Sequence, residues 1–310
     1  MGHFGMIEQA AVYSDITRLN GWRFHVKHLK LGHQQKIMAQ MGGASRTVRK
    51  GRGMEFSEVR LYQPGDEVRH IDWRVTARTQ TPHTKLFTEE HERPIVFVVE
   101  QSPSLFFGSQ GCFKSVRVLD ALAILGWAGL NQGDRVGGIV FGQQRGQWLE
   151  PKRQAKVLLQ LFDNGLKQQQ LITKPGLVTS QGWFNALNQI SGLLHPASKV
   201  ILIGDMFNLD NEALNKLQNL SRHNPITALH ITDPLEQSLP MLGEVEFNDG
   251  ENQFVIDSND TKTRAKYAAD YHQAWLGLKQ NLISRRVSLV SLDTVHNPIE
   301  RLLQQKVLRT

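Results

Sequence analysis

Two carboxylates and two hydroxyls have a spacing in the sequence that could form an all-oxygen site. Glu100 ends an apolar run and is followed at alternate positions by Ser102 and Ser104, while Asp205 follows a second apolar run. If both runs are strands of one parallel sheet, their carboxyl ends meet at the edge where such sheets commonly bind ligands. Oxygen ligands suit a hard dication such as Mg²⁺. The competing interpretation is that these residues only cap helix starts and loops.

A second group of charged residues, nearer the amino end, could also do chemistry. Asp66, Arg69, Asp72, Arg74 and Arg78 lie within a short segment. Bidentate pairs between arginine and carboxylate would make a structural network of them. The alternatives are a partner-binding surface, or an unrecognised hydrolase that uses Asp66, Asp72 and Arg78.

Common nucleotide-binding and catalytic motifs do not occur in the sequence. Gly51 and Gly53 lack a third glycine at dinucleotide-binding spacing, and no Gly-x-x-x-x-Gly-Lys-Ser/Thr occurs. No Gly-x-Ser-x-Gly surrounds Ser102 or Ser104, and no His-Glu-x-x-His is present. We expect Cys112 to be a small packed hydrophobe. The sequence therefore favours a protein that is not an enzyme.

The order of apolar runs predicts a doubly wound α/β fold with a mostly parallel sheet. Short, nearly continuous apolar runs alternate with helical segments, as in sheets covered by helices on both faces. Expected strands are residues 95–99, 136–141, 200–203, 226–231 and 287–290. Expected helices are residues 115–130, 153–162, 183–194, 211–220, about 260–283, and one from Pro298. A hairpin should join 244–247 to 253–256, and Gln168 to Gln170 should form an exposed loop.

The segment that contains Asp72 shows a different pattern. Ile71, Trp73 and Val75 alternate with polar residues, which is typical of a half-buried strand. This pattern predicts a strand over residues 71–76, with Ile71 and Trp73 facing a core.

The net charge of the chain, +7, is concentrated near its beginning. Between residues 18 and 52 there are nine Lys and Arg residues and no Asp or Glu. Leu19, Trp22, Val26 and Leu29 recur near helical spacing, so we expect a basic helical arm. The arm would dock on an acidic partner surface or, alternatively, bind nucleic acid, with Trp22 and Phe24 stacking on bases. Its basic residues are Arg18, Arg23, Lys27, Lys30, Lys36, Arg46, Arg49, Lys50 and Arg52.

Composition sets broad limits on the class of protein. The chain has 310 residues, 40% of them hydrophobic, which is enough for a substantial core. A single cysteine excludes a disulfide framework. The first residues lack a signal-peptide pattern, and no run reaches the roughly 18 apolar residues of a membrane span. These features predict a cytoplasmic location.

Several ordered blocks resemble the signature of the bacterial domain-of-unknown-function family 58 (DUF58). The most specific block is Pro64-Gly65-Asp66 followed by Ile71-Asp72-Trp73. Further matches are Thr76-Ala-Arg78, Gly133-Asp134-Arg135, Asp205 and Asp233-Pro234. The signature residues with side chains suited to binding or to structure are Glu55, Arg60, Asp66, Arg69, Asp72, Trp73 and Arg78.

The resemblance implies a domain similar to von Willebrand factor A (vWA) domains, in which an Asp-x-Ser-x-Ser loop forms a metal-ion-dependent adhesion site. Glu100 stands at the position of that Asp, Ser102 and Ser104 match the two hydroxyl ligands, and Asp205 matches the strand-end acid. Glu100 departs from the pattern, and the usual Thr-Asp is not evident near Thr179. The resemblance therefore leaves two options, a Mg²⁺ site or a degenerate, metal-free interaction surface.

Family members are commonly encoded beside MoxR-type AAA+ ATPases, so the resemblance implies an adaptor that works with such an ATPase. We expect residues 1–53 to be the basic helical arm and residues 54–93 a small β-containing signature region. Residues 94–310 should form the vWA-like α/β domain.

Overall fold

The computed structural model describes residues 11–32, 54–63, 66, 68–89, 94–176, 181–248 and 253–310. The chain forms two compact units. Unit 1 combines Met1–Gln34 with Arg93–Thr310, and unit 2 is Gln35–Glu92.

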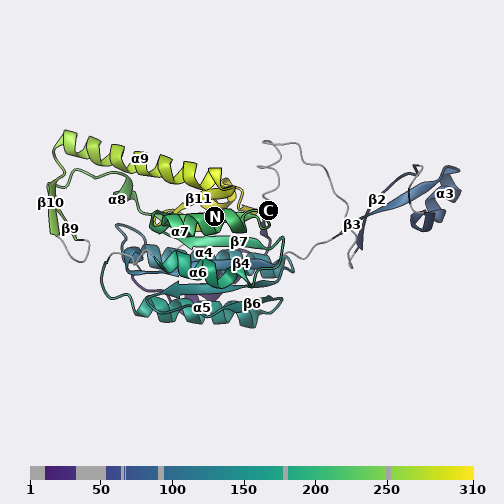
Figure 1. The fold of residues 1–310 in the computed structure, drawn as a ribbon, viewed down its shortest axis with the longest axis horizontal. Helices are drawn as coiled ribbons and strands as arrows, with labels where there is room; N and C mark the ends of the chain where they lie inside the picture. The colour runs from purple at the N-terminus through teal and green to yellow at the C-terminus, as the bar shows by residue number, and fades with distance from the viewer. Residues whose placement is uncertain are drawn as a thin grey trace. The chain divides into compact units, whose positions relative to one another are not determined.

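A six-stranded sheet forms the centre of unit 1 within the described residues (Figure 1). Its spatial order is β11-β8-β7-β4-β5-β6. All neighbouring pairs are parallel except β5 and β6. The strands are β4 (Ile95–Gln101), β5 (Val136–Gly142), β6 (Leu149–Lys152), β7 (Lys199–Gly204), β8 (Ile226–Thr232) and β11 (Val287–Asp293). The predicted doubly wound, mostly parallel α/β fold is confirmed.

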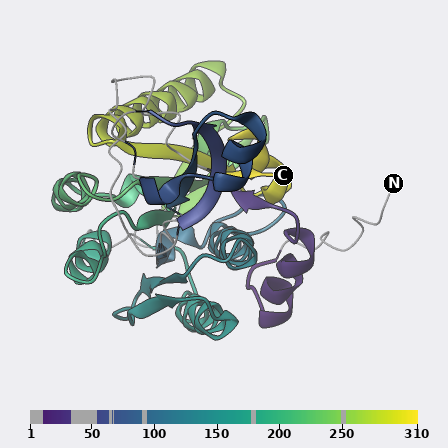
Figure 2. The same ribbon diagram turned by 90° about the vertical axis from the view of Figure 1, so that its right-hand side faces the viewer.

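Helices cover both faces of this sheet (Figure 2). The helices on one face are α1 (Ile16–His25), α4 (Lys114–Asn131), α5 (Ala155–Gln170) and α10 (Pro298–Gln304). Those on the other face are α6 (Gln181–Ser191), α7 (Asn211–Leu220) and α9 (Thr261–Ser284). Successive side chains of a strand point to opposite faces, so β4 contributes to both cores. Phe97 and Val99 pack in the first core, and Val96 and Val98 pack in the second.

Shorter elements complete unit 1. The pair β1 (Lys30–Leu31) and β12 (Leu308–Arg309) is antiparallel, and so is the predicted hairpin of β9 (Glu244–Asn248) and β10 (Gln253–Asp257). Turns of 3₁₀ helix follow two strands, η2 (Pro103–Leu105) after β4 and η3 (Met206–Asn208) after β7. The short helix α8 (Pro234–Gln237) follows β8.

The predicted exposed loop at Gln168 to Gln170 is wrong, because these residues end α5. Gln168 and Gln169 are buried. The Gln169 amide bonds to Ser115 Oγ and accepts from the Ser14 backbone N–H, so polar side chains fasten the helix end to its neighbours.

Unit 2 contains an antiparallel pair, β2 (Met54–Leu61) and β3 (His83–Glu89), with η1 (Val68–His70) and α3 (Trp73–Thr79) between them. The expected strand over residues 71–76 is wrong. Asp72 accepts from the backbone N–H groups of Arg74 and Val75 and so starts a helix instead. The side chain of Trp73 is 66% exposed, so the expectation that it faces a core is also wrong.

Candidate functional site: the carboxyl edge of β4 and β7

The sheet order reverses direction at β4, whose two neighbours are β5 and β7. Crevices at such switch points are the usual ligand sites of open α/β sheets. The structure brings Glu100, Ser102, Ser104 and Asp205 together at this point, as expected from their positions after β4 and β7. We call this group, with the side chains that bond to it, the carboxyl-edge cluster.

Glu100 is fully buried, and both of its oxygens accept hydrogen bonds from the protein. Oε1 accepts from Ser102 Oγ at 2.7 Å and from Asn208 Nδ2 at 2.9 Å. Oε2 accepts from the backbone N–H of Asp205 at 2.7 Å. A Cβ at position 204 would lie 2.5 Å from that same oxygen, so only glycine leaves room for the longer glutamate side chain. Burial, reinforced by the neighbouring Asp205 carboxylate, raises the pKa of Glu100 to about 7.

The two hydroxyls and Asn208 extend the same network. Ser102 Oγ lies 3.0 Å from Ser104 Oγ, and Asn208 Nδ2 donates to Ser104 Oγ at 3.0 Å. Asn208 comes from η3, which begins at Asp205, while Ser102 and Ser104 come from the turn after β4. The Asn208 amide therefore ties the ends of β4 and β7 together.

Asp205 forms an ion pair with a fully buried lysine. Lys114 Nζ lies 2.7 Å from Asp205 Oδ2 and 2.6 Å from Glu236 Oε1. Burial alone would lower the pKa of Lys114, but these two carboxylates raise it above its ordinary value. Burial opposes ionisation of Asp205, yet Lys114 and other donors hold the pKa of that carboxyl below its usual range. Lys114 is therefore a permanent ammonium between two carboxylates.

His230 of β8 lies behind Asp205 and is fully buried. Its Nδ1 accepts from the backbone N–H of Met206 at 3.1 Å, and Nε2 has no hydrogen-bond partner within the described part of the chain. Burial lowers the pKa of His230 to about 4, so the ring is neutral near pH 7. The ring stacks on Trp275 and makes an edge contact with Phe207.

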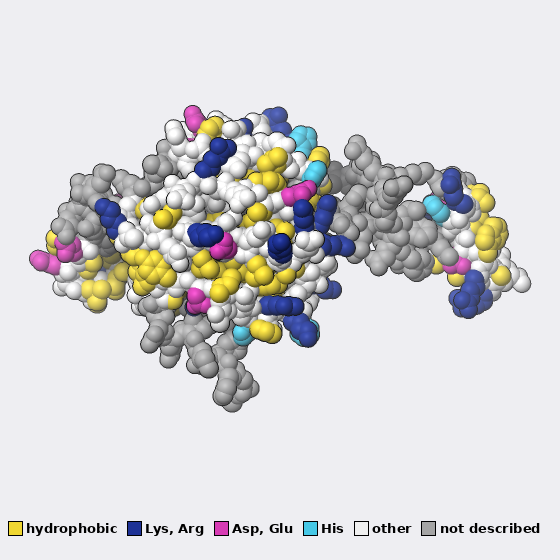
Figure 3. All heavy atoms as spheres, turned by 90° about the horizontal axis from the view of Figure 1, so that it is seen from below, with side chains coloured by type: hydrophobic (Ala, Val, Ile, Leu, Met, Phe, Trp, Pro, Cys, Tyr) yellow, Lys and Arg dark blue, Asp and Glu magenta, His cyan; other side chains and the backbone are white. Residues whose placement is uncertain are grey.

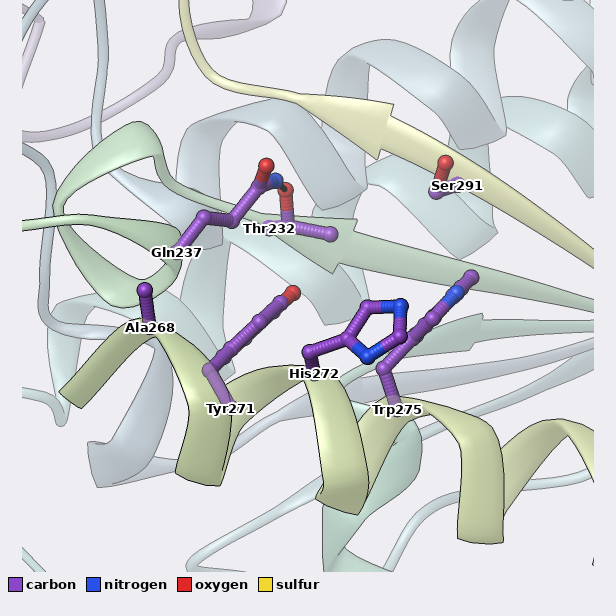
Figure 4. A pocket seen from close by; sticks show the side chains of 7 residues that line it. All are labelled: Thr232, Gln237, Ala268, Tyr271, His272, Trp275 and Ser291. Carbon is purple, nitrogen blue, oxygen red and sulfur yellow. Dashed lines mark hydrogen bonds between the residues drawn. The ribbon is translucent and has the colours of Figure 1, made fainter. Parts of the chain in front are cut away.

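A pocket of ≈ 350 Å³ lies next to this aromatic group, between α9, α8 and the ends of β8 and β11 (Figure 4). Tyr271, His272 and Trp275 of α9 line one side, and Thr232 and Ser291 line the other. Tyr271 also makes an edge contact with Phe207. Phe207 therefore lies between the pocket wall and the carboxyl-edge cluster.

The residues of the cluster do not fit a bound Mg²⁺. Mg²⁺ requires near-octahedral oxygen ligands at about 2.0–2.1 Å. Here the Glu100 oxygens accept three protein hydrogen bonds, and Ser104 Oγ is bonded to an amide. Asp205 is neutralised by Lys114. Within the described ranges, no three His, Cys, Asp or Glu side chains are arranged to hold a metal ion.

Three family-signature residues of unit 2, Arg60, Asp66 and Asp72, make hydrogen bonds within their own unit. Arg60 donates to Asp66 at 2.7 Å, and Asp66 also accepts from the Gln63 backbone N–H. Asp72 caps α3. Arg69 and Arg78 are exposed, and the Glu55 side chain lies outside the described part. The two carboxylates proposed for a hydrolase, Asp66 and Asp72, thus hold backbone and arginine groups of their own unit.

The beginning of the basic arm is packed into unit 1. Arg18 makes a bidentate pair with the buried Asp120 of α4, at 2.8 and 2.7 Å, and Trp22 Nε1 donates to the same carboxylate. Arg23 lies over the Trp127 ring. Lys27 and Lys30 are exposed. The remaining arm residues, Lys36, Arg46, Arg49, Lys50 and Arg52, lie outside the described residues.

Basic side chains are nonetheless common at the surface of unit 1. The face of unit 1 in Figure 3 carries more Lys and Arg than Asp and Glu side chains. Phe24 is 81% exposed, whereas Trp22 is buried and cannot stack on a base.

Sequence reasoning missed Lys114, Asn208, Glu236 and His230. Two signals were present. Lys114 and Arg117 are cations at the start of a long, otherwise mostly apolar helix, and Glu236 is the fourth residue of Asp233-Pro-Leu-Glu, which forms a capping box. Asn208 and His230 carried no comparable signal, because their roles depend on contacts between different strands.

Among the described residues, no helix is both long and apolar enough to cross a membrane.

Solved structures that this chain resembles include the conserved hypothetical protein BatB from Bacteroides thetaiotaomicron. That match has a TM-score of 0.40 and 16% identity, and it covers 69% of this chain and 97% of BatB. An aerotolerance-related membrane protein from Bacteroides fragilis matches with a TM-score of 0.37 and 14% identity, covering 69% and 98% of the two chains.

Curated relatives include uncharacterized proteins of Mycobacterium bovis and Mycobacterium tuberculosis. Each is 26% identical over 276 residues, covering 84% of this chain and 83% of the relative. The model of the family described as "protein of unknown function DUF58" matches residues 58–274, more than two thirds of the chain. Because this match covers more than half of the sequence, the chain belongs to the DUF58 family.

Proposed function

We propose that this chain is a cytoplasmic, non-enzymatic adaptor that binds a partner protein at the carboxyl edge of β4 and β7. The polar groups of the carboxyl-edge cluster are mostly buried and already bond to one another, which suits a rigid support beneath a recognition surface rather than a reacting centre. These hydrogen bonds hold the neighbouring loops in one arrangement, so little conformational entropy is lost when a partner binds.

Exposed apolar side chains near this edge are the observation that carries the proposal. Phe207, in the turn after Asp205, is 39% exposed. Met241 and Leu242, between α8 and β9, are 71% and 67% exposed. Figure 1 shows α8 and the β9–β10 hairpin at one end of the sheet in unit 1. Apolar side chains beside satisfied polar groups are typical of protein–protein interfaces.

The partner we propose is a MoxR-type AAA+ ATPase, on the strength of the family resemblance alone. The ATPase would supply the energy, and this chain would supply the binding surface. Enzyme chemistry by the chain itself has less support, because Asp66 and Asp72 are engaged in local structure.

Co-purification of the full chain with a MoxR-type ATPase from the same organism tests the proposal. We expect a complex in EDTA as well as in Mg²⁺. Leu242→Asp should weaken it on the order of tenfold or more, because a charge would be buried in an apolar contact. The matched control is Leu193→Asp, which places the same charge on an exposed leucine after α6. No complex in either buffer, or equal loss with both variants, would contradict the proposal.

Nucleic-acid binding by the basic arm stays a second candidate, with Lys27, Lys30 and the exposed Phe24 as its described support. Binding through phosphates must weaken steeply as salt rises. A gel shift at low salt that disappears near physiological salt would favour it, and a salt-insensitive shift or none would remove it.

A further inference from the structure

The positive charge at the carboxyl edge comes from the chain itself. Lys114 is the first residue of α4, where the helix dipole disfavours a cation. It is nevertheless fully buried, with its ammonium within 2.7 Å of one Asp205 oxygen and 2.6 Å of one Glu236 oxygen. A buried lysine at this unfavourable position requires both carboxylates to compensate it.

Asn208 bonds to other oxygens of the carboxyl-edge cluster. Its amide nitrogen lies 2.9 Å from Glu100 Oε1 and 3.0 Å from Ser104 Oγ, so it donates to two of the oxygens that the sequence pattern assigns to a dication. Ser102 Oγ closes the ring by bonding to both Glu100 and Ser104. The Asn208 amide hydrogens therefore bond to oxygens that could otherwise bind a cation.

We propose that Lys114 and Asn208 together close a latent dication site, so that the native chain binds no divalent metal at this edge. Lys114 supplies the compensating charge for Asp205 and Glu236, and Asn208 takes the position between Glu100 and Ser104. A dication entering the native cluster would meet the Lys114 ammonium and would have to displace the Asn208 amide. This inference does not rest on the proposed adaptor role, because metal binding is measured without a partner.

Removing either side chain should open the site. Lys114→Met keeps the length of the side chain but leaves Asp205 and Glu236 as two carboxylates without a cation. Mg²⁺ and Mn²⁺ commonly bind through one or two carboxylates plus water. Asn208→Ala frees Glu100 Oε1 and Ser104 Oγ without removing a charge.

The experiment is a Mn²⁺ titration of the purified full chain, followed by thermal unfolding and by calorimetry. We expect no Mn²⁺-dependent rise in the melting temperature of the wild type. Lys114→Met and Asn208→Ala should each bind Mn²⁺ on the order of tenfold or more tighter than the wild type, with a melting temperature that rises with Mn²⁺. If Lys114→Met does not fold, Asn208→Ala still tests the proposal, because Asn208 is only half-buried.

The matched control is Lys199→Met. Lys199 is half-buried, and its ammonium donates to the Gly32 carbonyl at 2.9 Å, so its loss should create no Mn²⁺ binding. Wild-type Mn²⁺ binding that Asp205→Asn abolishes would overturn the proposal. Folded Lys114 and Asn208 variants that bind Mn²⁺ no better than the wild type would overturn it equally.

Discussion

Glu100 and His230 lie in one buried cluster but respond to pH in opposite directions. Burial raises the pKa of Glu100 from 4.5 to about 7, so between these values the folded chain holds a proton that the unfolded chain lacks. Burial lowers the pKa of His230 from 6.5 to about 4, so between those values only the unfolded chain holds the proton. Rising pH therefore costs stability through Glu100 and adds stability through His230.

Glu100→Gln and His230→Gln should separate the two effects. For each group, the difference between the ordinary pKa and the pKa in the folded chain corresponds to about 3 kcal/mol. Relative to the wild type, Glu100→Gln should gain up to about that much in free energy of unfolding as pH rises from 4.5 to 7. His230→Gln should gain a similar amount as pH falls from 6.5 to 4. Urea unfolding at a series of pH values measures both slopes.

The matched control for the histidine is His223→Gln, which makes the same substitution at an exposed position outside the buried cluster. Profiles of Glu100→Gln and His230→Gln that run parallel to that of the wild type would show that neither group carries a buried, shifted titration.

At the scale of elements, hydrogen bonds to Asp120 hold α1 against α4. Asp120 is fully buried in α4 and accepts three hydrogen bonds, two from Arg18 and one from Trp22. Asp120→Asn removes the charge that pairs with Arg18, and breaking a buried pair costs about 3–5 kcal/mol. We expect a loss of that size in urea unfolding, with faster amide hydrogen exchange in α1 than in α4.

Asp163→Asn in α5 is the control for this prediction. Asp163 pairs with Lys167 at 2.6 Å, but both side chains are mostly exposed, so the change should cost less than about 1 kcal/mol. Equal losses from the Asp120 and Asp163 variants would mean that the buried pair does not hold α1.

The central sheet could be predicted because its strands are buried on both faces and are therefore continuous apolar runs, as at β4. The alternation at residues 71–76 was misleading. Asp72 has a helix-capping side chain, and the apolar Trp73 is exposed, so burial did not impose the period of two. An alternation of apolar and polar residues predicts a strand only where one face of the segment is buried.

The candidate site was predictable to the level of strand ends. Parallel strands bring their carboxyl ends to one edge, which is enough to place Glu100 near Asp205. The identity of the cation was not predictable, because Lys114 and Asp205 are 91 positions apart and meet only through tertiary packing.

For the whole molecule, unit 2 is an insertion between two neighbouring points of unit 1. Lys199 bonds to both points, with its ammonium on the Gly32 carbonyl and its backbone N–H on the Pro94 carbonyl, each at 2.9 Å. Gly32 and Pro94, the described residues on either side of unit 2, therefore both lie within hydrogen-bonding reach of a single lysine. The two hydrophobic cores of unit 1 contain no described residue of unit 2.

Replacing residues 35–92 with about ten Gly and Ser residues should therefore leave unit 1 folded, because such a linker spans the short gap without strain. We expect a melting temperature within about 4 °C of the full chain, which corresponds to about 1 kcal/mol for a domain of this size. Circular dichroism melting and the retained slow exchange of β4 and β7 amides measure the outcome. An unfolded or aggregated product would mean that unit 2 supplies stability to unit 1. A folded product would allow the signature residues of unit 2 to be tested for partner binding separately from the carboxyl-edge cluster.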